Sequence, residues 1–128
     1  MTTPAITQLH ARLLELHRTL LALVRAEYEK EHGPIPNAGA MLQLVIGHDA
    51  FAWLRPLSRL LVDLDDKDIV PDDVAARAAV EKRLLGVGNP FWDRYSKLLE
   101  STPAIATEHA EVMRLVQGLP EALPRVLA

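Results

Sequence analysis

Hydrophobic residues recur along the chain at steps of three and four, and no segment alternates for long between apolar and polar residues. This spacing is typical of helices that bury one face, whereas strands show a period of two. Prolines and glycines interrupt the pattern at intervals that suit short helices. We therefore predict an all-α fold, with helices over residues 4–31, 38–47, 50–66, 72–85, 90–100 and 103–117.

Several predicted helices begin at a side chain that can cap the first turn. In Thr3-Pro4 the proline also takes the first helical position, where its missing N–H is not needed. The same signal recurs at Asn89-Pro90 and Thr102-Pro103. Asn37 is expected to cap helix 38–47, and glycine and proline after residue 32 end the first helix.

Helix 50–66 carries the clearest core face. Asp49 is predicted to cap it, because within a longer helix this carboxylate would fall among buried positions. Seven residues of the helix share one stripe and are expected to be buried: Ala50, Trp53, Leu54, Leu57, Leu60, Leu61 and Leu64. Pro56 lies outside the stripe and is expected to bend the helix. We expect helices 4–31 and 50–66 to form the centre, and helices 38–47, 72–85 and 90–100 to close the ends.

Length, composition and charge narrow the class of protein. A chain of 128 residues suits a single domain over residues 1–128, a helical bundle of five or six helices with a proline-bent central helix. The absence of cysteine excludes disulfides, thiolate metal ligands and a cysteine nucleophile. A net charge of -3 argues against a nucleic-acid partner. With no signal-peptide pattern and no apolar run near the ~20 residues that span a bilayer, we expect a cytoplasmic protein without a membrane partner.

An apolar strip on helix 50–66 lies away from the core stripe. Phe51 and Val62 fall close together on the helical wheel, and Arg55, Ser58 and Arg59 flank them. The apolar fraction of 49% is high for so short a chain. Another helix of the same chain can cover the strip; otherwise the pattern predicts a two-fold homodimer in which the strip meets its own copy.

Three histidines lie at the edges of predicted apolar faces, where bundles build metal and cofactor sites. His10 and His17 are roughly 10 Å apart along the helix axis, so they cannot share one ion. A divalent-metal or small-ligand site would therefore combine one of them with His109 and a carboxylate of Glu27 or Glu31. Alternatively, these histidines are structural and hydrogen-bonded to backbone or carboxylate partners. No other cofactor is predicted.

Other acidic and aromatic patterns predict no chemistry. One Glu-x-x-His element ends at His32, whereas a di-metal centre uses two. The acidic run from residue 63 to 73 has Asp68 and Val74 where a calcium loop needs glycine and glutamate, so we expect a solvated turn that caps helix 72–85. The aromatic face of helix 90–100 is expected to pack in the core, or else to line a ligand pocket. No phosphate loop or nucleophile elbow is present, which disfavours an enzyme.

The segment FAWLRPLSRLL, residues 51 to 61, resembles a family of small bacterial helical proteins of unknown function. The resemblance implies a helical fold and carries no catalytic motif. The sequence leaves two hypotheses for function. The favoured one is a non-catalytic, self-associating interaction or structural protein, and the alternative is a metal- or small-ligand-binding bundle.

Overall fold

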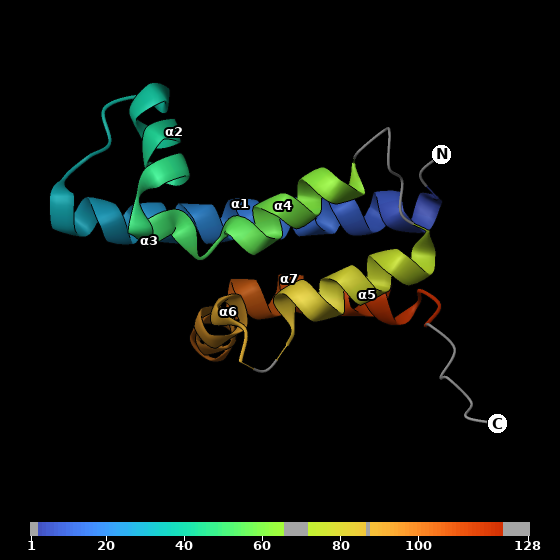
Figure 1. Ribbon diagram of the computed structural model, residues 1–128. Helices are drawn as coiled ribbons and strands as arrows, with labels where there is room; N and C mark the ends of the chain where they lie inside the picture. The colour runs from blue at the N-terminus through green and yellow to red at the C-terminus, as the bar shows by residue number, and fades with distance from the viewer. Residues whose placement is uncertain (1–2, 66–71, 87, 122–128) are drawn as a thin grey trace.

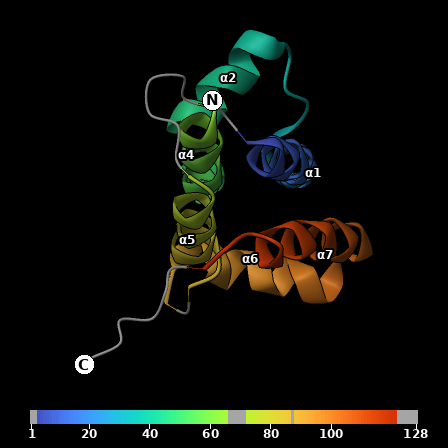
Figure 2. The ribbon, with the colours of Figure 1, turned by 90° about the vertical axis from the view of Figure 1, so that its right-hand side faces the viewer.

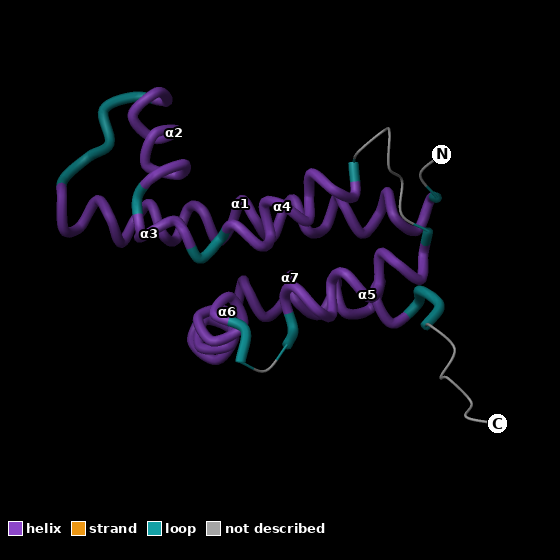
Figure 3. Tube along the Cα trace, viewed as in Figure 1, coloured by secondary structure: helices purple, strands orange, loops and turns teal. Residues whose placement is uncertain are grey.

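The computed structural model describes residues 3–65, 72–86 and 88–121, and all regular structure in these ranges is helical. The all-α prediction is therefore confirmed. The described helices are α1 (Pro4–His32), α2 (Ala38–Gly47), α3 (Asp49–Ala52), α4 (Arg55–Leu64), α5 (Asp73–Leu84), α6 (Pro90–Ser101) and α7 (Pro103–Gln117). Turns and loops connect the helices wherever the connecting residues are described (Figure 3). Within the same ranges, no helix combines the length and the apolar character needed to cross a membrane.

Capping side chains begin several helices where the sequence predicts them. Thr3 accepts a hydrogen bond from the backbone N–H of Ile6 at 3.2 Å, and Asn37 accepts one from Ala40 at 2.8 Å. Asp72 caps α5 in the same way, as expected for the end of the acidic run. Each such bond satisfies a donor that the helix cannot satisfy itself, and contributes on the order of 1 kcal/mol. Two members of the run, Asp66 and Asp68, lie outside the described residues.

The helices form two layers (Figures 1 and 2). α1 and α4 lie side by side in one layer, and α5 and α7 lie below them. α6 runs across one end of the second layer, and α2 rises from the first layer at that end (Figure 1). The most extensive contacts join α1 to α7, α1 to α4 and α4 to α5.

The predicted centre is therefore only partly right. α7 is the main neighbour of α1, and α5 lies along α4 rather than closing an end. The apolar stripe of each helix fixes which face is buried, but not which other stripe covers it.

The buried faces of α1 and α4 are the predicted ones. In α1 the fully buried residues are Ile6, Leu9, Leu13, Leu16, Leu20 and Val24. In α4 they are Leu57, Leu60, Leu61 and Leu64, with Leu54 just before its start. Trp53 and Ala50 are half-buried and pack against this core.

The predicted helix 50–66 is in fact two helices. α3 ends at Ala52 and α4 begins at Arg55. The helix is therefore interrupted before Pro56 instead of bending there. Pro56 has no N–H for the carbonyl of Ala52, and it occupies the first turn of α4, where none is needed. Asp49 is also not the cap. The Nδ1 atom of His48 accepts from the backbone N–H of residue 50 at 3.0 Å.

The structure divides the predicted apolar strip, and α1 of the same chain covers Phe51, which is one of the two alternatives that the sequence left open. Phe51 is only 1% exposed and packs 6.1 Å from Tyr28, between ring centroids. The strip assumed one continuous helix from residue 51 to 62, whereas a turn through Trp53 and Leu54 interrupts it. Ser58 is half-buried and hydrogen-bonded to His17 at 2.9 Å. Only Val62 and the two arginines keep the predicted exposure.

Candidate functional site

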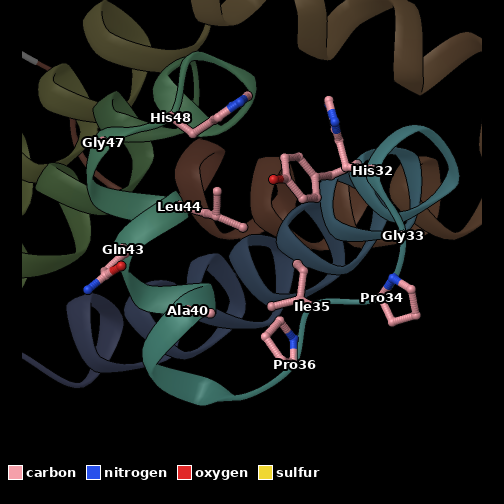
Figure 4. Close-up of a pocket in the computed structure, with 11 residues that line it drawn as sticks. His32, Gly33, Pro34, Ile35, Pro36, Ala40, Gln43, Leu44, Gly47 and His48 are labelled. Carbon is pink, nitrogen blue, oxygen red and sulfur yellow. The ribbon is translucent and has the colours of Figure 1, made fainter.

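A hook at one end of the molecule forms one side of an open cavity. α1 ends there, the chain turns through residues 33–37, and α2 returns toward the first layer (Figure 1). The cavity between them has a volume of about 510 Å³. Its lining includes Tyr28, His32, Ile35, Leu44 and His48 (Figure 4).

Glycine and a carboxylate fix the turn that closes the hook. Gly33 has a φ of 85°, which a residue with a side chain rarely adopts, and its N–H donates to the carbonyl of Glu29 at 2.9 Å. The Glu29 carboxylate accepts from the Ile35 N–H at 3.0 Å and also pairs with Arg25 at 3.3 Å. These bonds fix the position of Ile35, which forms part of the cavity floor and is 8% exposed.

Three rings form one wall of the cavity. The ring of Tyr28 lies 4.5 Å from that of His32 and 5.3 Å from that of His48, between centroids. The two imidazoles lie 6.3 Å apart. The wall therefore joins two segments that are 16 positions apart in the sequence, from 32 to 48.

The cap at α3 fixes the protonation pattern of His48. Because Nδ1 accepts the N–H of Ala50, it has no proton, and the neutral ring carries its proton on Nε2. His48 therefore presents a donor to the cavity and no lone pair for a metal ion. Among the described residues, no group of three or more histidine, aspartate or glutamate side chains could hold a metal ion.

The histidines predicted as metal ligands lie apart and have structural partners. His10 bonds through Nε2 to the carbonyl of Leu61 at 3.1 Å, and His17 bonds through Nε2 to the Ser58 hydroxyl at 2.9 Å. On α7, the Nδ1 atom of His109 lies 2.8 Å from the Tyr95 hydroxyl. One partner is a backbone carbonyl as expected, whereas the other two are hydroxyls instead of carboxylates.

The predicted carboxylates do not join these histidines. Glu27 and Glu31 are exposed on the last turns of α1. Glu31 lies beside the neighbouring His32, with 3.8 Å between Oε2 and Nε2. The proposed combination of one α1 histidine, His109 and a carboxylate is therefore not assembled.

Burial shifts the pKa values of three residues in these hydrogen-bonded pairs. Desolvation lowers the pKa of His17 and of His109 from the ordinary value of 6.5. Burial, and secondarily the charge of Glu108, raises the pKa of Tyr95 well above its ordinary value. The Tyr95 hydroxyl therefore stays protonated, and the tautomer of His109 decides which of the two groups donates the hydrogen bond between them.

A second feature is an exposed surface on α2 and α4. Leu42 and Ile46 lie one turn apart on α2 and are 59% and 64% exposed, and Val62 on α4 is 68% exposed. Arg55 and Arg59 are exposed on the same face of α4 as Val62, opposite its buried stripe. We call these five residues, Leu42, Ile46, Arg55, Arg59 and Val62, the α2–α4 surface.

The two helices of this surface are tied together. The guanidinium of Arg55 donates to the backbone carbonyl of Ile46 at 2.7 Å. Beside them, a hollow of about 590 Å³ is lined by Arg55, Arg59 and Arg83, and Arg83 pairs with Asp63. The surface therefore combines apolar side chains with guanidinium groups.

Sequence reasoning missed the hook cavity and the α2 part of the surface. His32, His48 and Tyr28 lie outside the apolar stripes, and only the return of α2 over α1 brings them together. The apolar composition of α2 could have predicted an exposed apolar surface. A helix that is apolar on every side exposes an apolar face unless the rest of the molecule covers it completely. None of its residues is fully buried.

Comparisons of the chain with protein-family models, with curated proteins and with solved structures found no match. The resemblance of residues 51–61 to a bacterial family stays a prediction.

Proposed function

We propose that this protein is a non-catalytic interaction protein that forms a homodimer through the α2–α4 surface. One observation carries the proposal. Among the described residues, the large hydrophobic side chains that are exposed are Leu42, Ile46 and Val62, and all of them belong to this surface. Exposed apolar side chains favour association, because pairing removes them from water.

Charge complementarity favours a second copy as the partner. Arg59 and Asp63 lie one turn apart on the exposed side of α4. If two copies of α4 pack antiparallel around a two-fold axis at the level of Leu61, each Arg59 faces the partner's Asp63, a carboxylate that also pairs with Arg83 of its own chain. The two Val62 side chains then meet near the axis, as the isologous contact of a dimer requires. Such ion pairs set register more than affinity.

The proposal keeps part of the surface predicted from the sequence and replaces the rest. Arg55, Arg59 and Val62 remain, whereas Phe51 and Ser58 are withdrawn because they pack inside the chain. Leu42 and Ile46 take their place. A cytoplasmic location stays a prediction of the sequence.

Light scattering coupled to size exclusion tests the proposal at micromolar concentration. We expect the wild type to have twice the mass of the 14.2 kDa chain, and Val62→Glu to have the mass of a monomer. The substitution places a carboxylate at an apolar contact, where its desolvation is costly.

Ala11→Glu is the matched control, because it adds the same charge at an exposed position of α1 outside the surface. It should leave the dimer intact. A monomeric wild type would refute self-association. A dimer that both substitutions leave intact would refute the assignment of the interface.

A further inference from the structure

We propose that the hook cavity is a binding site for a small planar aromatic molecule that carries a neutral hydrogen-bond acceptor, such as an aromatic amide. This site is separate from the α2–α4 surface, so the inference does not depend on the proposed function.

The size and floor of the cavity suit a small apolar ring. Its volume of about 510 Å³ lies within the range of about 300 to 1,000 Å³ typical of ligand pockets. Ile35 and Leu44 supply aliphatic surface, and both lie among the residues that line the cavity in Figure 4. A flat molecule can cover this floor while its edge stays near solvent.

The ring wall favours an aromatic ligand over an aliphatic one. Tyr28 and His32 lie 4.5 Å apart with an interplanar angle of 35°, and His48 meets Tyr28 edge-on at 5.3 Å. The side chain of His32 is half exposed, so the wall has an accessible ring at its open side. An added aromatic ring can extend such an arrangement by offset stacking or edge contacts.

Donors at the rim determine the polar group of the ligand. In Figure 4 the imidazoles of His32 and His48 point to the same side of the cavity, away from Pro36. The Nε2–H of His48 is fixed as a donor by the cap at α3. A ligand acceptor, such as a carbonyl oxygen, can take this hydrogen bond.

The charges around the rim favour a neutral acceptor. Glu29 is compensated by Arg25 and by the Ile35 N–H. Glu31 lies 3.8 Å from His32, so the histidine's positive charge, when present, already has a counterion. No cationic side chain is left over among the residues that line the cavity to pair with a carboxylate. An ammonium group, in turn, has no lone pair and cannot accept the Nε2–H bond.

Amide ¹H–¹⁵N spectra of the full chain, recorded during titration with benzamide, test the proposal. Benzamide has the ring and the carbonyl, cyclohexanecarboxamide lacks the aromatic ring, and benzylamine lacks the acceptor. We expect benzamide to bind with a dissociation constant on the order of millimolar, as its size implies, and to shift Gly33 and Gly47. The other two probes and benzoate should bind more weakly. Shifts confined to other parts of the chain, or equal affinity for all probes, would overturn the proposal.

His48→Asn tests the donor without removing the cap. Asparagine is a favoured capping residue, so the N–H of Ala50 keeps an acceptor while the imidazole is lost. We expect benzamide to bind about threefold to tenfold more weakly, the range for one hydrogen bond. His10→Asn makes the same exchange outside the cavity and should leave affinity unchanged.

Unchanged affinity in His48→Asn would overturn the assignment of the donor. If that variant does not fold, Leu44→Trp serves instead, because the larger side chain fills the cavity from α2. Benzamide binding that survives a folded Leu44→Trp would overturn the assignment of the site.

Discussion

At the scale of single residues, apolar positions are easier to predict than polar ones. The six buried residues of α1 follow directly from their spacing, because every one of them lies on the same face of an unbroken helix. Phe51 could not be placed in this way, since the break before Pro56 lies between it and Val62. The partners of His17 and His109 lie on other helices, at Ser58 and Tyr95, and the sequence holds no record of that pairing.

The half-buried histidines make stability depend on pH. The pKa values of His17 and His109 are lowered from 6.5 in the folded chain by desolvation, so the fold favours their neutral forms. The unfolded chain therefore binds more protons below pH 6.5. The contribution of the neutral rings is fully present above that value and is lost as the pH falls from 6.5 toward the lower folded pKa values.

We predict that the urea midpoint decreases between about pH 7.5 and about pH 5.5, and that His109→Gln reduces this decrease. Glutamine does not titrate, and it can still accept from the Tyr95 hydroxyl. A His109→Gln variant whose midpoint falls as steeply as that of the wild type would show that His109 is not a source of the pH dependence.

At the scale of elements, the helix starts and ends are the best predicted features. Thr3, Asn37 and Asp72 cap their helices because a short polar side chain satisfies an otherwise unpaired N–H. The start of α3 was missed by one residue, since an imidazole rather than a carboxylate accepts the bond. The division of helix 50–66 into two was missed because proline is compatible with a bend as well as with a new first turn.

Two glycines of the hook test the account of its geometry. Gly33 has a φ of 85°, a ψ of 176° and no atom within 4 Å of an added Cβ, so Gly33→Ala should cost about 1 to 3 kcal/mol through the backbone alone. Gly47 also has free space at the Cβ position and ends α2 without a positive φ. Gly47→Ala should therefore stabilise the protein by about 0.4 to 1 kcal/mol, because alanine lowers the entropy of the unfolded chain. Urea unfolding measures both, and shifts of the same sign would contradict the assigned backbone conformations.

At the scale of the whole molecule, the fold class follows from periodicity but the arrangement of the helices does not. The apolar stripes of α1 and α4 are evident in the sequence. The helix that makes the most extensive contacts with α1, however, is α7. The hook cavity was not predictable for the same reason. It exists only because α2 returns toward α1 and brings His48 beside Tyr28.

The absence of cysteine from the chain allows a direct test of the two-fold pairing of α4. Val62→Cys places one thiol near the proposed axis, and Ala11→Cys places one thiol at an exposed position of α1. A disulfide requires Cα atoms about 4.4 to 6.8 Å apart, so it forms readily only where two copies already hold the thiols together. Under mild oxidation at micromolar concentration, we expect Val62→Cys to become a covalent dimer quickly and Ala11→Cys to stay largely monomeric. Cross-linking of both variants at the same slow rate, or of neither, would contradict the proposed dimer.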